Sequence, residues 1–197
     1  SHLLLSTKNN VKNLNASHFK NTDKLIDGVL RFNGINEELN VSLVNSTEAV
    51  KGDVEITNLN ENGNVNIKTS INAVGNGSKE HKGSINVVAN NNIVTDSGTA
   101  LEANNDIIMS AQNGSITTNG TLNAKNNVKL TSSNSKITTV GTVTATNGNV
   151  EFTAKEGIKT NDEVVSTNAD IILANTNNAI EVGKLTGKNV SVTNEKG

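Results

Sequence analysis

Residues 106–147 read "DIIMSAQNGSITTNGTLNAKNNVKLTSSNSKITTVGTVTATN", and this stretch repeats itself. Shifted by about 21 residues, its apolar positions fall on one another: Ile107 on Val128, Met109 on Leu130, Ile116 on Ile137 and Leu122 on Val143. The stretch contains no aromatic residue, proline, cysteine or histidine. A fixed period of this length is typical of solenoids, so the repeat has to be interpreted before any other feature.

Three columns of aliphatic residues extend this repeat along the chain. The first runs through Val54, Val65, Ile85, Ile107, Val128, Val150, Ile171 and Val190. The second runs through Ile93, Ile116, Ile137, Ile158 and Ile180, and the third through Leu101, Leu122, Val143, Val164 and Leu185. The steps in the third column are all 21, and those from Val65 onward in the first are 20, 22, 21, 22, 21 and 19. Three columns in phase indicate a structural repeat with three apolar segments.

Each apolar segment alternates apolar and polar residues, as in "KITTV" and "TVTAT", which favours strands with one buried face. Short polar residues and glycines, which tolerate turns, separate the segments. The residue before each first-column position is short and polar: Asp53, Asn64, Ser84, Asp106, Asn127, Asn149, Asp170 and Asn189. A second corner column contains Gly120, Gly141, Asp162 and Gly183. The pattern predicts an all-β parallel β-helix solenoid with three strands and about 21 residues per turn.

Composition argues against the rival architectures. Asn accounts for 37 of the 197 residues, and aromatic residues for only 2%. Such polarity could indicate disorder, but a disordered chain has no reason to keep Val and Ile in phase. A sandwich would not keep three apolar columns at constant spacing, a leucine-rich repeat needs a Leu/Asn consensus that is absent, and the Asn, Thr, Val and Gly content disfavours helix.

The N-terminal part is less regular. Residues 53–197 are expected to form regular β-helix repeats, and residues 1–52 to form looser turns or an insertion of the same solenoid. Within it, 39–44 resembles a strand, and 19–32 could be a strand pair or a short helix. The chain starts with Ser1-His2 and stops at Gly197 within the pattern, so we expect a fragment of a longer protein.

Charge gives no sign of a nucleic-acid or membrane partner. The formal net charge is −2 with both signs interspersed, and Arg31 is the only arginine, so we expect no nucleic-acid binding. No apolar run approaches the ~18 residues of a membrane span, so no membrane insertion is expected.

The sequence offers no convincing catalytic, metal or cofactor site. His2, His18 and His81 lie in irregular parts without a second ligand at metal spacing. Acidic pairs occur at Glu37-Glu38, Asp53/Glu55 and Asp162-Glu163. Residues i and i+2 of a strand share a face, so Asp53 and Glu55 could be neighbours, but a solvated strand face explains them better. We therefore expect no enzyme, no catalytic or metal residue and no cofactor.

The segment "GSITTNGTLNAKNNVKLTSSNSKITTVGTVTATNGNVEFTAKEGI" (114–158) resembles the repeats of filamentous haemagglutinin and of the high-molecular-weight adhesins. These are two-partner secretion exoproteins of Gram-negative bacteria, and the resemblance covers roughly residues 53–197. It implies a right-handed β-helix shaft, exported through an outer-membrane transporter partner and displayed on the cell surface or secreted. Lack of cysteine fits passage of an unfolded chain through a pore.

The resemblance implies a shaft or binding segment of a secreted adhesin that attaches to a glycan or protein of host cells. Two alternatives remain: the shaft of a contact-dependent inhibition or haemolysin-type toxin, and a β-helical polysaccharide-active enzyme. Receptor-binding residues are unknown at this stage, because on a polar strand face they look like solvated residues.

Asn-x-Ser/Thr sequons occur seven times, at Asn15, Asn40, Asn45, Asn76, Asn113, Asn119 and Asn189. The high-molecular-weight adhesins carry sugars at such sites. The resemblance therefore implies glycosylation at Asn113 or Asn119.

Overall fold

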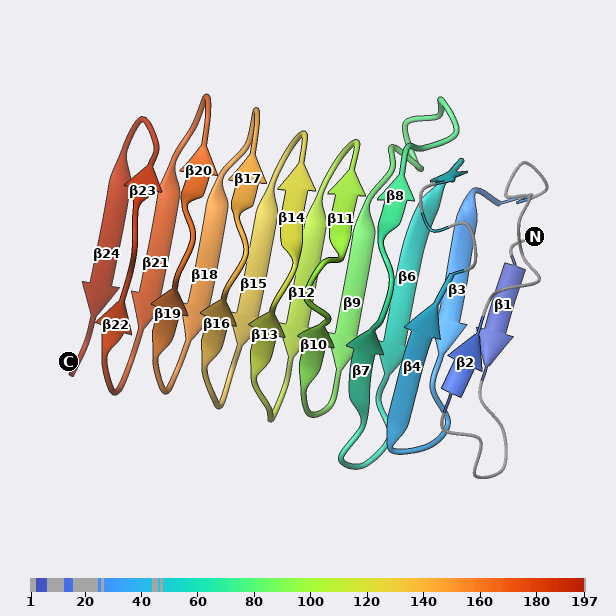
Figure 1. Cartoon of the computed structure of the whole chain (residues 1–197), viewed down its shortest axis with the longest axis horizontal. Helices are drawn as coiled ribbons and strands as arrows, with labels where there is room; N and C mark the ends of the chain where they lie inside the picture. The colour runs from blue at the N-terminus through green and yellow to red at the C-terminus, as the bar shows by residue number, and fades with distance from the viewer. Residues whose placement is uncertain are drawn as a thin grey trace.

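The computed structural model describes residues 3–6, 13–15, 25, 27–43, 46 and 48–196. In these ranges the chain forms a parallel β-solenoid without helices, whose strands stack turn upon turn along one long axis (Figure 1). No helix long and apolar enough to cross a membrane occurs in the described part. The predicted all-β parallel β-helix is confirmed.

The described strands form three parallel sheets of nine, eight and seven strands, which we call sheets A, B and C. Sheet A contains β1 (Leu3–Ser6), β3 (Val29–Asn33), β6 (Asp53–Asn58), β9 (Ile85–Ala89), β12 (Ile107–Ala111), β15 (Val128–Ser132), β18 (Val150–Ala154), β21 (Ile171–Asn175) and β24 (Val190–Asn194). Sheet B contains β2 (Asn13–Asn15), β4 (Glu38–Ser42), β7 (Asn64–Ile67), β10 (Ile93–Thr95), β13 (Ile116–Thr118), β16 (Ile137–Thr139), β19 (Ile158–Thr160) and β22 (Ile180–Glu181). Sheet C contains β5 (Ala49–Val50), β8 (Ile71–Ala73), β11 (Ala100–Ala103), β14 (Thr121–Ala124), β17 (Val143–Ala145), β20 (Val164–Ser166) and β23 (Leu185–Thr186).

Strand pairing confirms the repeat from Ile85 onward. Ile107 pairs with Val128, Ile116 with Ile137 and Leu122 with Val143, as the self-alignment of 106–147 predicts. From Ile85 the sheet A column advances by 22, 21, 22, 21 and 19 residues to reach Val190. Each column is therefore one inward-facing position of a sheet, repeated once per turn.

The assignment of Val65 to the first column is wrong. Val65 lies in β7 of sheet B, where it pairs with Leu39 and Ile93. The residue of sheet A that precedes Ile85 is Val54, a step of 31 residues. The turn is long because the chain adds an excursion between β8 and β9, and the distance from Val65 to Ile85 matched the repeat by coincidence. Asn64 accordingly precedes a sheet B strand.

The interior is one continuous core of apolar, mostly aliphatic side chains from all three sheets. Along each strand buried residues alternate with more exposed ones, as in the buried–half-buried–buried pattern of β16. One inward column of sheet A stacks Phe32, Ile56, Val87, Met109, Leu130, Phe152 and Leu173. Two of the three phenylalanines of the chain thus fill the same position, and both are fully buried.

The described strands of the N-terminal part continue the same three sheets. β3 pairs with β6, β4 with β7, and β5 with β8. Residues 39–42 and 53–56 are strands as expected, and 29–33 forms β3. Most of the preceding segment 19–28, which we expected to be strand or helix, lies outside the described residues.

We predict that Ile137→Asn destabilises the fold strongly while Thr138→Asn is nearly silent. Ile137 is fully buried between Ile116 and Ile158, whereas its neighbour Thr138 faces outward. The first substitution removes buried apolar surface and leaves an amide without solvent, a cost of about 3–5 kcal/mol. Urea unfolding followed by circular dichroism measures both, and equal effects would contradict the inward assignment of Ile137.

Candidate functional site

A ladder of side-chain acceptors runs along the corner before sheet A. In each turn a side-chain oxygen accepts the backbone N–H of the equivalent residue in the next turn. The bonds, given as oxygen to nitrogen, are Asp53 to Ser84 (2.7 Å), Ser84 to Asp106 (3.3 Å), Asp106 to Asn127 (2.9 Å), Asn127 to Asn149 (2.9 Å), Asn149 to Asp170 (3.0 Å) and Asp170 to Asn189 (3.2 Å). Only a short side chain with an acceptor oxygen can make this bond, which explains why the column contains only Asp, Asn and Ser.

A second ladder of the same kind precedes sheet B, but it ends half-way along the solenoid. Asn64 Oδ1 accepts the N–H of Asn92, and Asn92 Oδ1 accepts that of Ser115, at 3.0 and 2.8 Å. The equivalent positions in the next three turns are Lys136, Gly157 and Ala179, as the pairing of the following isoleucines fixes. The Ser115 hydroxyl bonds to Ser135 instead of to the Lys136 N–H, and none of the three equivalent residues carries a side-chain acceptor oxygen. The ladder therefore stops at Ser115.

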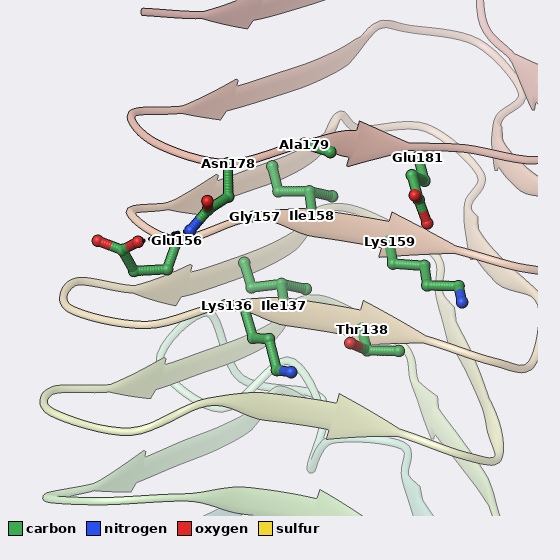
Figure 2. A pocket seen from close by; sticks show the side chains of 10 residues that line it. All are labelled: Lys136, Ile137, Thr138, Glu156, Gly157, Ile158, Lys159, Asn178, Ala179 and Glu181. Atoms are coloured by element: carbon green, nitrogen blue, oxygen red, sulfur yellow. Dashed lines mark hydrogen bonds between the residues drawn. The ribbon is translucent and has the colours of Figure 1, made fainter. Parts of the chain in front are cut away.

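A shallow hollow of about 200 Å³ lies where the second ladder is missing (Figure 2). Its lining comes from β16, β19 and β22 and from the corners that precede these strands: Lys136, Ile137, Thr138, Glu156, Gly157, Ile158, Lys159, Asn178, Ala179 and Glu181. Gly157 has φ of +127°, a conformation suited to glycine, and a Cβ there would lie 3.2 Å from the carbonyl oxygen of Ala179. The missing side chain at this position leaves the hollow open.

The polar groups around the hollow differ in whether they already have partners. Glu156 accepts hydrogen bonds from the side-chain amides of Asn177 (3.1 Å) and Asn178 (2.8 Å). Lys136 and Lys159 are exposed, and neither forms an ion pair within the part of the chain that the structure describes. Glu181, exposed on the strand next to Lys159, is also without a side-chain hydrogen bond there. The hollow therefore offers two amines and one carboxylate to a ligand.

A second hollow lies on sheet C. It has a volume of about 350 Å³ and is lined by Asn72, Val74, Glu102, Ala103, Asn104, Asn123 and Lys125. Its charged groups are one acid and one base. Asn104 is already engaged, since its side-chain amide donates to the carbonyl of Val74 (2.9 Å).

The predicted neighbours Asp53 and Glu55 have different partners. Asp53 is buried and accepts hydrogen bonds from the backbone N–H groups of Gly83 and Ser84, while its other oxygen lies 2.9 Å from His81 Nδ1. Glu55 forms an ion pair with Arg31 on the adjacent strand, at 2.5 Å. Asp53 thus fastens the end of the excursion 75–83 to the body of the solenoid, a structural arrangement.

Within the described ranges, no histidine belongs to a candidate metal site. His81 has Asp53 as its neighbour, and no group of three or more His, Cys, Asp or Glu side chains that could hold a metal ion occurs there. His2 and His18 lie outside the described residues.

The carboxyl group of Glu163 has a lowered pKa, because the Thr186 hydroxyl donates to it at 2.6 Å and the Lys184 ammonium lies 3.6 Å away.

The two candidate glycosylation sites lie at corners of the solenoid. Asn113 is exposed, and its amide donates to Asn90 Oδ1 at 2.8 Å. Asn119 is half-buried, and its amide donates to the carbonyl of Thr95 at 3.0 Å. Both amide nitrogens therefore belong to turn-to-turn contacts, and modification at either residue stays a prediction.

The comparisons with known proteins found no match to this chain among protein-family models, curated proteins or solved structures.

The sequence did not predict the hollow at Gly157. Its lining residues come from three successive turns, and none of them belongs to a recognisable motif. One signal was available: at the position before the sheet B column, the side-chain acceptors Asn92 and Ser115 give way to Lys136, Gly157 and Ala179. The second column already aligned these positions, so the break was visible in the sequence.

We predict that Asn149→Ala destabilises the solenoid by about 1–2 kcal/mol, because the backbone N–H of Asp170 loses its acceptor. Asn147→Ala is the matched control, since its side-chain oxygen accepts only the exposed amide of Asn168. The control should change the free energy of unfolding by less than about 0.5 kcal/mol. Equal urea midpoints for the two variants would show that the corner ladder contributes nothing to stability.

Proposed function

We propose that this chain is the shaft and binding segment of a secreted bacterial adhesin, attaching to a glycan or protein on the surface of host cells without catalysis. The observation that carries the proposal is the repetition of outward-facing polar side chains along the strands. Figure 1 shows the continuous stack that these strands form. Every turn presents side chains on three faces, and successive turns place equivalent positions about 4.8 Å apart.

The outer faces are suited to many weak contacts. From β10 onward, for example, the outward positions of sheet B carry Val94, Thr117, Thr138, Lys159 and Glu181 in successive turns, and four of these five residues are polar. Hydroxyl, amide and ammonium groups on an exposed strand face each form modest hydrogen bonds or charge contacts in water. Attachment through such groups gains strength from repetition rather than from one deep site.

The resemblance to two-partner secretion exoproteins supports the same proposal. It adds export through an outer-membrane transporter partner and display at the surface of a Gram-negative cell as parts of the proposal. A toxin shaft would share the solenoid, and the described residues include no feature that favours it. A polysaccharide-active enzyme would need converging acidic groups, and Glu156, the acid next to Gly157, is already bonded to two amides.

Adhesion can be tested with beads that carry the purified chain at two densities. At equal total protein, densely coated beads should bind epithelial cells better than sparsely coated beads, because many weak contacts form at once. An unrelated β-helical protein at the same density is the control. Adhesion of dense beads no better than this control would refute the binding role, and turnover of any polysaccharide by the chain would favour the enzyme instead.

A further inference from the structure

The hollow at Gly157 lies where the corner ladder before sheet B is missing. On β4 and β7 of this sheet the outward side chains bond to one another: Asn64 and Asn66 both donate to Glu38, and Asn66 also donates to Asn40. At the corners before β13 and β16, the hydroxyls of Ser115 and Ser135 share a hydrogen bond of 2.6 Å. Side chains that satisfy each other have few free groups for a ligand.

Beyond Ser135 the pattern changes. Lys136, Lys159 and Glu181 have no side-chain hydrogen bond or ion pair among the described residues, and Gly157 between them has no side chain at all. Figure 2 shows Lys159 and Glu181 on neighbouring turns at one side of the hollow, Lys136 below it, and Glu156 held by Asn178 at the other side. Free donors and a free acceptor therefore surround one open space.

We infer that this hollow binds a single carboxylate-bearing sugar unit, such as a uronic acid residue, of a host-cell glycan. The inference rests on the proposed adhesive function and names its ligand class. The two ammonium groups of Lys136 and Lys159 receive the carboxylate through charge-assisted hydrogen bonds. The carboxylate of Glu181 and the hydroxyl of Thr138 accept hydrogen bonds from the sugar hydroxyls.

The balance of charge selects one carboxylate rather than many anionic groups. The lining contains two lysines and two glutamates, so its formal charge is zero. A densely sulfated chain would bring several negative charges against Glu156 and Glu181. A monocarboxylate sugar places its charge at the lysines and its hydroxyls at the acids, so a lining with both signs suits it. A neutral sugar leaves both ammonium groups without the anion.

The volume agrees with partial enclosure of one sugar ring. A space of about 200 Å³ that opens to solvent can hold part of a monosaccharide but does not surround it. With few fixed contacts and two flexible lysines, we expect affinity near the millimolar level. Such a site contributes to attachment only as one of many, as the proposed adhesion requires.

The test is a ¹⁵N NMR titration of the whole chain with three probes: methyl glucuronide, methyl glucoside and acetate. The first two differ only in the carboxylate, and acetate carries the carboxylate without the ring. Methyl glucuronide should shift the amide signals of Gly157, Lys159 and Thr138 in a saturable way. The other two probes should bind at least about tenfold more weakly, each lacking one of the two kinds of contact. Equal affinities for glucuronide and acetate, or for glucuronide and glucoside, would overturn the inference.

Three variants assign the effect to the hollow. The double variant Lys136→Gln/Lys159→Gln should bind methyl glucuronide with an affinity at least about tenfold lower, since both cations are removed. Glu181→Gln should strengthen glucuronide binding, because it removes a like charge and keeps an acceptor. Lys129→Gln is the matched control: Lys129 is exposed on sheet A next to Glu151, and its loss should change nothing. Circular dichroism confirms that each variant is folded, and unchanged binding in a folded double variant would refute the site.

Bead adhesion by the same double variant tests the adhesive function separately from sugar binding in the hollow. Loss of both glucuronide binding and adhesion supports both. If the chain binds glucuronide but its beads never adhere to cells, the hollow stands and the adhesive function fails. If the double variant loses glucuronide binding and its beads adhere as before, the adhesive function stands and the hollow is not its receptor site.

Discussion

The structure depends on one constraint: each strand between the ends of a sheet pairs in parallel with its equivalent one turn earlier and one turn later. Such pairing places equivalent residues about 4.8 Å apart, so each side chain has a copy of its own position as its nearest neighbour. Inside, this stacks aliphatic residues into a continuous core. Outside and at the corners, it requires side chains that can tolerate or bond to the residue above them. Asparagine, with a donor and an acceptor on one short side chain, suits such a stack, which accounts for its abundance.

The corner ladders show how this constraint reaches the backbone. At the corner before sheet A, the N–H of each turn is satisfied by a side chain of the previous turn, from Asp53 to Asn189. Loss of one oxygen there leaves a backbone donor of the next turn without its partner, so each turn depends on its neighbour for more than strand pairing. The same logic locates the open part of the surface. Lys136, Gly157 and Ala179 replace the acceptors before sheet B, and none of these three residues makes a side-chain bond to the next turn in the described part of the chain.

The proposed function depends on a place where outward side chains do not bond to one another. A solenoid whose outward groups all bonded to one another would present few free donors or acceptors to another molecule. Lys136, Lys159 and Glu181 remain free around a hollow that one missing side chain creates. The proposed binding of a carboxylate-bearing sugar therefore draws on a local departure from the repeat, whereas the proposed avidity of adhesion draws on the repeat itself.

The sequence by itself determined the parallel β-solenoid, because three aliphatic columns with constant spacing have few other ways to be buried together. It also identified the corner column of Asp, Asn and Ser, and the inward direction of Ile137, from the two-residue period alone. It misplaced Val65, since spacing cannot distinguish a strand of sheet B from one of sheet A when an excursion lengthens a turn to 31 residues. Only the tertiary structure decided that Asp53 fastens that excursion through His81, Gly83 and Ser84, and that Lys136, Gly157 and Glu181 surround one hollow. The physical reason is the same in both cases: these residues are 20 or more positions apart in the chain, and only the stacking of turns brings them together.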